Sequence, residues 1–413
     1  MHTRVRGLLF VPALLVAGCP EPTTEPDAHV ASETDAFVPP GVDAPMASET
    51  DAAVIATGPR LISLSAGEDT TCAVLEDGTA RCWGANSVGQ LGNGTTTSSV
   101  RPVVVSGLTD AIQISTGYDI TCALRSGGTV MCWGDNFNGR LGTGDEEDST
   151  VPVAVEGLTN VTQVVAGFST VCALTDRGDV WCWGRGGELG DGGVDSSGVP
   201  IPVPTLDDVS VLAGASHGGT SLSSHTCGFQ LSGPFCWGLN SDGQNGNGTQ
   251  DSNRSPVPVA HPGGTAIAVG MNHGCIASPT DTQCFGASAL IGDGTVERRL
   301  SPTPVMTTQR FTALAAGFDH TCGLTSEGDV WCWGRNGSGQ IGDGEPLVIS
   351  DQRLVPVQAD VSDVTLLAAG ASHTCAHTES GVTYCWGRNE YGELGWGEPS
   401  SSTRTSVPTA VVW

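Results

Sequence analysis

Two groups of side chains have the residue types and spacing of catalytic or metal sites. Gly214-Ala-Ser-His-Gly218 matches the G-x-S-x-G turn that presents a serine nucleophile in some hydrolases. The same register recurs in Gly370-Ala-Ser-His-Thr374, which has the form of an ordinary repeat turn. We therefore interpret Ser216 as a turn residue. A hydrolase stays an alternative, and it would lose activity in a Ser216→Ala variant.

The second group consists of histidines that stand two residues before a cysteine: His225, His273, His320 and His373. Such histidines could line a ring around a metal ion, but the pattern is more typical of a structural hydrogen-bonding position. Carboxylates at Gly-Asp-Gly 292–294 and 342–344 and at Asp145–Asp148 could bind calcium weakly, and solvated loops explain them as well. We predict no catalytic residue, no metal site and no cofactor.

Cysteines set the frame in which these residues stand. Of the 15 cysteines, all but Cys19 fall into pairs whose members are nine or ten positions apart. The first members recur about every fifty residues, a period typical of propellers and other repeat arrays. We predict one repeat unit for each pair. The pairs are Cys72 with Cys82, Cys122 with Cys132, Cys172 with Cys182, Cys227 with Cys236, Cys275 with Cys284, Cys322 with Cys332, and Cys375 with Cys385.

Each pair flanks a predicted β-hairpin. Pairing Leu75 with Thr79 leaves a short loop that ends in Gly78, as a turn with a left-handed last position requires. The same register places Cys72 opposite Cys82, within the range of a disulfide. Units with the shorter cysteine spacing give a shorter loop and still oppose their cysteines. We predict a disulfide in every hairpin; free thiols or a metal array are the alternative, and C-x9-C is a poor zinc spacing.

The remainder of each unit supplies two more strands. One is a Pro/Val-rich run such as Arg101–Val105, and the other is a small-residue run such as Val164–Gly167, which suits a crowded strand near an axis. Four short strands per unit are the content of a propeller blade. We predict an all-β, seven-bladed propeller. In this prediction the strand at 407–412 pairs with the N-terminal strands and closes the ring.

The N-terminal segment has a different character. Arg4 and Arg6 precede an apolar run that is too short to span a bilayer and ends in Val16-Ala-Gly-Cys19. This ending resembles a bacterial lipobox, in which the cysteine is lipidated, and Cys19 is also the cysteine left without a partner. An ordinary secretory signal is the alternative. We predict a lipoprotein signal at 1–18 and an envelope protein anchored through Cys19, at the outer membrane or the cell surface.

Charge and composition define the next segment and exclude one class of partner. Residues 19–58 contain acidic side chains and prolines but no lysine or arginine, so we predict a disordered tether before a propeller at 59–413. The chain carries a formal net charge of −27. Because such a chain repels phosphate backbones and anionic lipid surfaces, we expect no nucleic-acid partner.

The repeat at His320–Gly342, His-Thr-Cys-x-Leu-x-x-x-Gly-x-Val-x-Cys-Trp-Gly-x-Asn-x-x-Gly-Gln-Ile-Gly, resembles that of the regulator of chromosome condensation family. The resemblance covers about residues 60–413 and is weaker at Cys284-Phe285-Gly286. It implies a seven-bladed propeller. The family's best-known activity, nucleotide exchange on a nuclear small GTPase at chromatin, is not expected of an exported acidic chain. A secreted bacterial member that plugs β-lactamases with one face makes enzyme inhibition an alternative function.

Departures from the repeat indicate where a partner could bind. Unit four has an insertion rich in Gly and Ser before its hairpin, and a smaller one lengthens the loop between Gly334 and Pro356. Insertions in repeat proteins often map to a binding face, although neutral drift is an alternative. We predict a monomeric, non-catalytic propeller that binds a protein or other macromolecule through one face. The candidate binding loop is Ala215, Ser216, His217, Gly218, Gly219, Thr220, Ser221 and Leu222.

Overall fold

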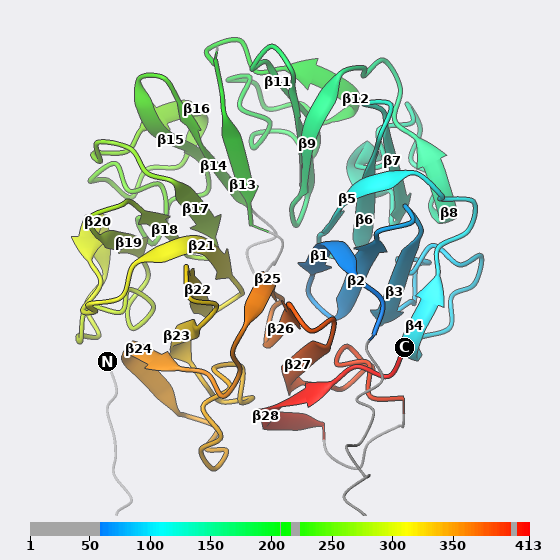
Figure 1. Cartoon of the computed structure of the whole chain (residues 1–413). Coiled ribbons are helices and arrows are strands. Elements are labelled where there is room, and N and C mark those ends of the chain that lie inside the picture. The colour runs from blue at the N-terminus through cyan, green and yellow to red at the C-terminus, as the bar shows by residue number, and fades with distance from the viewer. Residues whose placement is uncertain (1–57, 207, 216–223, 398–402) are drawn as a thin grey trace, which may run out of the picture. The chain divides into compact units, whose positions relative to one another are not determined.

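A computed structural model describes residues 58–206, 208–215, 224–397 and 403–413. Within this part of the chain, seven four-stranded antiparallel sheets are arranged around a central axis (Figure 1). Each sheet consists of four strands that are consecutive in sequence. The predicted seven-bladed, four-stranded propeller is confirmed.

In every blade the chain runs from an inner strand at the axis, through a hairpin of two strands, to an outer strand at the rim. Blade 1 contains β1 (Leu61–Ala66), β2 (Thr70–Leu75), β3 (Ala80–Gly84) and β4 (Ser99–Val104); blade 2 contains β5 (Ala111–Thr116), β6 (Ile120–Arg125), β7 (Val130–Gly134), the 3-10 helix η1 (Phe137–Gly139) and β8 (Ser149–Ala154); blade 3 contains β9 (Val161–Ala166), β10 (Thr170–Thr175), β11 (Val180–Gly184) and β12 (Ser197–Pro202); blade 4 contains β13 (Val211–Gly214), β14 (His225–Gln230), β15 (Gly233–Gly238) and β16 (Asn253–Pro258); blade 5 contains β17 (Ala266–Val269), β18 (His273–Ala277), β19 (Thr282–Gly286) and β20 (Arg299–Pro304); blade 6 contains β21 (Phe311–Ala316), β22 (His320–Thr325), β23 (Val330–Arg335) and β24 (Gln352–Gln358); blade 7 contains β25 (Val364–Ala369), β26 (His373–Thr378), β27 (Thr383–Arg388) and β28 (Arg404–Ala410).

The central hairpin of each blade has the register that the cysteines predict. In blade 1 the Leu75 N–H donates to the Thr79 carbonyl at 2.9 Å, Gly78 has a φ of 81°, and Cys72 pairs with Cys82. All seven predicted disulfides form, with Cα atoms 4.0 to 4.1 Å apart, and each ties the two middle strands of its blade together. In blades 2 to 7 the bridges join Cys122 to Cys132, Cys172 to Cys182, Cys227 to Cys236, Cys275 to Cys284, Cys322 to Cys332, and Cys375 to Cys385.

The small-residue runs form the inner strands, as predicted. They line an axial channel of about 210 Å³, whose walls include Ala66, Thr116, Ala166, Ala316 and Ala369. Small side chains let seven strands approach the axis together. The channel walls are therefore formed mainly by backbone and short side chains.

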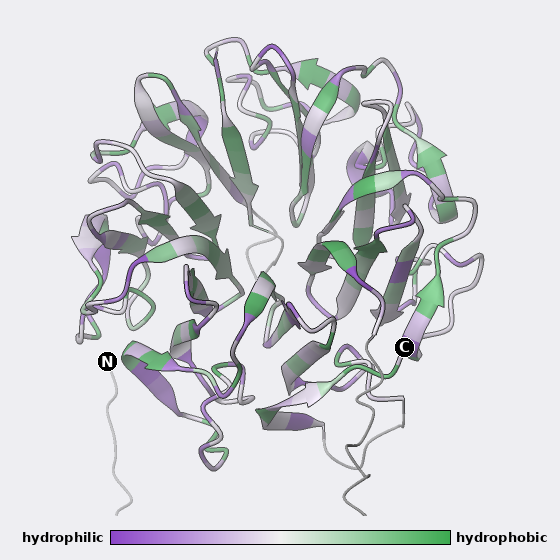
Figure 2. Ribbon diagram, in the orientation of Figure 1, coloured by the Kyte–Doolittle hydropathy of each residue, from purple (hydrophilic) through white to green (hydrophobic). Residues whose placement is uncertain are grey.

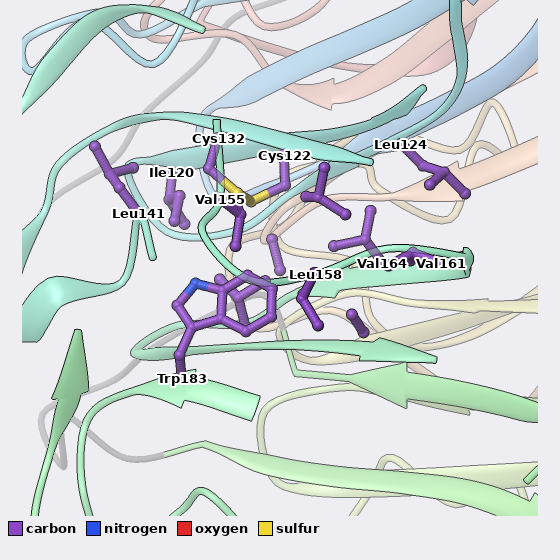
Figure 3. Close-up of a cluster of buried hydrophobic side chains, with 14 residues drawn as sticks. Ile120, Cys122, Leu124, Cys132, Leu141, Val155, Leu158, Val161, Val164 and Trp183 are labelled. Atoms are coloured by element: carbon purple, nitrogen blue, oxygen red, sulfur yellow. A yellow bond between two sulfur atoms is a disulfide. The ribbon is translucent and has the colours of Figure 1, made fainter. Parts of the chain in front are cut away.

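The hydrophobic core is divided into layers between neighbouring blades. Figure 3 shows one such layer, in which Trp183 of blade 3 points toward the Cys122–Cys132 bridge of blade 2. Leu141 and Val155, from the loop after η1 and the end of the outer strand, complete the contact. Apolar positions lie mainly on the strands (Figure 2). Both faces of each sheet are thereby covered by adjacent blades.

The predicted mode of ring closure is wrong. The C-terminal strand β28 pairs with β27 of its own blade, and β1 pairs with β2 of its own blade. The chain begins blade 1 with an inner strand and ends blade 7 with an outer strand, so no described blade takes a strand from the other end of the chain. Blades 1 and 7 close the ring by packing, as in the apolar cluster that contains Leu61, Trp83 and Val411.

Candidate functional site

At five of the boundaries between described blades, a hydrogen bond from a tryptophan ties the blade to the long loop of its neighbour. The indole N–H of the Cys-Trp-Gly tryptophan donates to a backbone carbonyl in the long loop of the preceding blade, at 2.8 to 2.9 Å. The long loops of blades 1, 2, 3, 6 and 7 are thus each tied to the next blade. The pairs are Trp83 with Glu393, Trp133 with Gln90, Trp183 with Arg140, Trp237 with Glu188, and Trp386 with Gln340.

An asparagine that follows Cys-Trp-Gly by two positions holds the long loop in shape. In blade 1, Asn86 accepts the Leu91 N–H at 2.9 Å and donates to the Thr97 carbonyl at 2.9 Å. Gly84 is required just before it, because its φ is 106° and a Cβ there would lie 2.2 Å from the Asp69 carbonyl oxygen. The repeat motif therefore encodes a rigid loop.

One end of the propeller, which we term the long-loop face, carries these loops together with the turns that follow the inner strands. The turns form a collar around the channel mouth, because the N–H of one turn donates to a carbonyl of the next. Examples are Phe168 to Ala215 at 2.9 Å and Ala371 to Gly67 at 3.1 Å. The opposite end of the described propeller carries the short hairpin turns and the links between blades.

The blade-four insertion starts and ends on the long-loop face. Residues 216–222 of the predicted binding loop, together with Ser216 of the hydrolase motif, lie outside the described residues. Ala215 is buried, and its carbonyl accepts the Phe168 N–H. At the other end Ser224 donates to the buried Glu188 carboxylate from its N–H at 3.1 Å and its hydroxyl at 3.0 Å. Blade 3 therefore holds both ends of the insertion.

A pocket of about 430 Å³ lies on the same face between blades 2 and 3. Its aromatic lining comes from Tyr118, Phe137 and Phe168, and the rings of Tyr118 and Phe168 are tilted with centroids 4.7 Å apart. Phe137 is 68% exposed and stands at the rim. Since Phe168 also bonds to Ala215, the pocket adjoins the base of the insertion.

Charged groups line the polar part of this pocket. Arg140 is buried and donates to the Asp135 carboxylate, to the Asp135 carbonyl at 3.0 Å and to the Phe168 carbonyl at 2.6 Å. Asp119 accepts the Gln90 side-chain amide at 2.7 Å. Burial raises the pKa of Asp119 to about 6, partly offset by Arg140 and reinforced by nearby carboxylates, Asp135 first. The pocket thus contains a carboxyl group whose burial is only partly compensated by a neighbouring cation.

Two residues that line the pocket have strained backbone conformations. Asp119 has a φ of 57° and Asn138 a φ of 61°. Both lie in the left-handed region, which residues other than glycine rarely adopt. Such strain persists where the surrounding structure holds it, often at functional sites. Sequence reasoning missed this pocket. Its signal was the departure of Phe137 and Arg140 from Ser87 and Gln90, their counterparts in blade 1.

Three of the four histidines before the cysteines form side-chain hydrogen bonds between blades, as interpreted. Within the described ranges no three His, Cys, Asp or Glu side chains gather as metal ligands. His225 has Gly274 at the partner position, so its ring nitrogens find no hydroxyl among the described residues. The other three, His273, His320 and His373, contact Thr321, Thr374 and Thr71 of the next blade through Nε2, at 2.7, 2.8 and 2.9 Å.

The candidate calcium ligands are used within their own loops. Asp293 pairs with Arg299 and Asp343 with Arg353, at 2.7 and 2.6 Å. Asp145 accepts the Thr143 hydroxyl at 2.7 Å. These carboxylates brace the long loops in the structure.

The predicted signal, Cys19 and the tether up to residue 57 lie outside the described residues. In the part of the chain that the structure covers, no helix has the length and apolar character needed to cross a membrane.

Known proteins share this repeat over a large part of the chain. The family model of the RCC1-like domain matches residues 40–345, and models of the regulator of chromosome condensation (RCC1) repeat match 327–377 and 364–393. The ultraviolet-B receptor UVR8 of Arabidopsis thaliana is 30% identical over 216 residues, 49% of this chain and 47% of the receptor. The secretion-regulating guanine nucleotide exchange factor of Mus musculus is 31% identical over 144 residues, 31% of this chain and 30% of that protein. The chain therefore spans less than half the length of these curated relatives.

Solved structures agree on the fold. Prp20p from Saccharomyces cerevisiae has a TM-score of 0.68 at 23% identity, covering 84% of this chain and 87% of its own. Human WBSCR16 has a TM-score of 0.67 at 20% identity, covering 77% and 86%. At these identities the likeness concerns the fold alone. Together with the match over residues 40–345, the seven blades establish that this chain belongs to the RCC1-like domain family.

Proposed function

We propose that this chain is a protein-binding propeller that is displayed outside the cytoplasm on a lipid anchor and binds its partner through the long-loop face. The observation that carries the proposal is the convergence of two departures from the repeat on that face. The blade-four insertion, held at Ala215 and Ser224, adjoins the aromatic pocket at Phe168. The proposal assigns no catalytic step to the chain.

Relatives of this fold bind proteins. The structure of Prp20p was described with its binding to Gsp1p and histones, and another structure holds Kap60 bound to yeast RCC1 (Prp20). Loops on a rigid scaffold are where propellers place recognition. That precedent supports a protein partner for this chain. It does not say which protein the partner is.

Seven disulfides support a location outside the cytoplasm, since such bonds persist in oxidising compartments. A lipid on Cys19 would then hold the propeller at the envelope surface, with residues 20–58 as the spacer. The test of the anchor is fractionation of cells that produce the chain or its Cys19→Ala variant. The parent should sediment with membranes and the variant should be released; a variant that stays in the membrane fraction contradicts lipidation.

The partner is tested by capture from envelope and culture-medium proteins with the full chain as bait. One variant lacks 216–222 on the long-loop face. The control variant is Leu231→Ser, at a 90% exposed residue of the hairpin turn at the opposite end of blade 4. A protein kept by the parent and the control but lost by the deletion supports the proposal. A protein lost only by Leu231→Ser would place binding on the other face, and the absence of any captured protein would count against a protein-binding role in the envelope.

A further inference from the structure

We infer that the pocket between blades 2 and 3 receives an arginine side chain of the partner protein, stacked against the aromatic wall of Tyr118, Phe137 and Phe168 and beside the Asp119 carboxylate. This inference rests on the proposed function and gives the partner a chemical character. It follows from the shape, the lining and the charge of the pocket.

The aromatic side chains supply flat apolar walls. Tyr118 and Phe168 come from turns of adjacent blades, and Phe137 comes from η1 in the long loop of blade 2. Phe137 is 68% exposed although it is a large apolar side chain. A guanidinium group is planar and weakly hydrated, so it stacks on such rings and is attracted by their electron-rich faces.

Existing ion pairs leave Asp119 as the carboxylate that a ligand can use. Arg140 is committed to Asp135 and to two backbone carbonyls. Arg185, which also lines the pocket, lies 4.0 Å from the Glu188 carboxylate. The side-chain donor on Asp119 is the Gln90 amide, which is neutral. A cationic side chain of the partner protein would give Asp119 a charged hydrogen-bond donor.

The surroundings of the pocket favour a basic partner. The long loop of blade 2 continues through four exposed acids at 145–148. On Asp119 itself the Asp135, Asp69 and Asp148 carboxylates raise the pKa, in the opposite sense to Arg140. Together with the chain's net charge of −27, these acids favour a basic occupant over an acidic one.

Arginine is preferred to lysine for a geometric reason. The guanidinium presents several N–H donors in one plane, so it can bond to Asp119 while its face stays against the rings. The ammonium of lysine is a compact, strongly hydrated charge, and its alkyl stem gains less from aromatic walls. A purely apolar anchor would leave Asp119 unused.

The test is a direct titration of the full chain with a soluble Gly/Arg repeat peptide, followed by calorimetry. Two further peptides carry citrulline or lysine in place of every arginine. Citrulline has nearly the shape of arginine without its charge. The variants are Asp119→Asn, which keeps a residue that tolerates a left-handed backbone, and Phe137→Ser, which introduces the residue of blade 1. The matched control is Asp319→Asn, at the same repeat position in blade 6, where Asp319 pairs with Arg335.

The Gly/Arg peptide should bind the parent, and affinity should fall about tenfold in Asp119→Asn and in Phe137→Ser, as expected when a charge-assisted contact or a stacking face is removed. The Asp319→Asn variant should bind like the parent. Equal binding of the citrulline peptide, tighter binding of the lysine peptide, full affinity in Asp119→Asn, or no binding to the parent would each overturn the inference. Thermal melting of each variant distinguishes a lost contact from a lost fold.

Failure of this inference differs from failure of the proposed function. If the capture experiment yields a partner that Asp119→Asn still retains, the arginine pocket is wrong and binding through the long-loop face stands. A partner that is retained by Asp319→Asn and lost by Asp119→Asn supports both.

Discussion

Glu188 and Ser224 are joined by two hydrogen bonds across the boundary between blades 3 and 4. The same carboxylate oxygen accepts the Ser224 N–H at 3.1 Å, the Ser224 hydroxyl at 3.0 Å and the Ser169 hydroxyl at 2.6 Å. Burial raises the pKa of Glu188, and these donors act against that rise. The end of the blade-four insertion is therefore fixed by a residue of the neighbouring long loop.

Replacing Glu188 with Ala should release this end of the insertion. Hydrogen bonds to a charged group contribute about 1.5 to 3 kcal/mol each, so amide exchange at Ser224 should accelerate by about tenfold to a hundredfold. Hydrogen exchange read by mass spectrometry measures this. Glu327→Ala, on the exposed hairpin of blade 6, is the control. Unchanged exchange at Ser224 would show that the carboxylate does not hold the loop.

The Glu393→Gln variant should be more stable than the parent at neutral pH. Burial raises the pKa of Glu393 to about 7, so between about pH 4.5 and 7 the folded state binds a proton that the unfolded state releases. The stability of the parent therefore falls as pH rises through this window. Glutamine fits, because Gln90 at the same repeat position accepts the Val88 N–H at 3.1 Å much as Glu393 accepts the Tyr391 N–H at 2.8 Å.

Thermal melting of both proteins from pH 4 to 8 tests this. The advantage of Glu393→Gln should be smallest near pH 4.5, grow to about 1 to 3 kcal/mol by pH 7 and then stay constant. Titrating groups other than its charged neighbours Asp69 and Arg388 cancel in the comparison. An advantage that shrinks as pH rises would reverse the assigned direction of the pKa shift.

Trp183→Phe should destabilise the propeller more than Trp333→Phe. Both indoles are buried, but Trp183 donates to the Arg140 carbonyl at 2.9 Å, whereas Trp333 Nε1 has no acceptor within the described residues. The difference should be about 0.5 to 1.5 kcal/mol, the contribution of one such hydrogen bond. Chemical denaturation measures it. Equal losses would mean that the indole contributes by packing alone.

Removing one bridge by substituting both of its cysteines, Cys122→Ala and Cys132→Ala, should lower the free energy of unfolding by about 2 to 3 kcal/mol, because each bridge closes a loop of only about ten residues.

The denatured, unreduced parent should show almost no free thiol from the propeller when titrated with a thiol reagent. Several reactive thiols would contradict the pairing.

A double-mutant cycle tests why blade 5 departs from the repeat. A Cβ at Gly274 would lie 2.7 Å from the Phe285 ring, so Gly274→Thr alone should destabilise by more than about 1 kcal/mol, the effect of overpacking. Phe285→Trp restores the repeat residue, and the threonine then gives His225 the partner that Thr321 gives His273. The double variant should be more stable than the sum of the single changes. Additive losses would mean that the two positions are independent.

The sequence by itself determined the blade count, the hairpin register and the disulfides. Cys72 and Cys82 carry this information because a short loop ending in Gly78 leaves a single pairing that opposes them. The hairpins of blades 3, 4, 6 and 7 likewise place their two cysteines directly opposite each other. The second cysteines of these pairs are Cys182, Cys236, Cys332 and Cys385. The sequence also indicated the hydrogen-bonding role of the histidines before the cysteines, because a residue that recurs at one repeat position in several blades is typical of a structural role.

Only the tertiary structure decided what lies between blades. Ring closure was predicted wrongly because a repeating sequence does not show at which strand one blade ends and the next begins. The shared apolar cluster of Trp83 and Val411 also does not appear in a linear pattern. Likewise Tyr118, Phe137 and Phe168 meet in one pocket although they come from different segments of two blades. Period and composition are local quantities, whereas the pocket depends on how neighbouring blades are placed about a common axis. That placement is fixed by contacts between residues far apart in the chain.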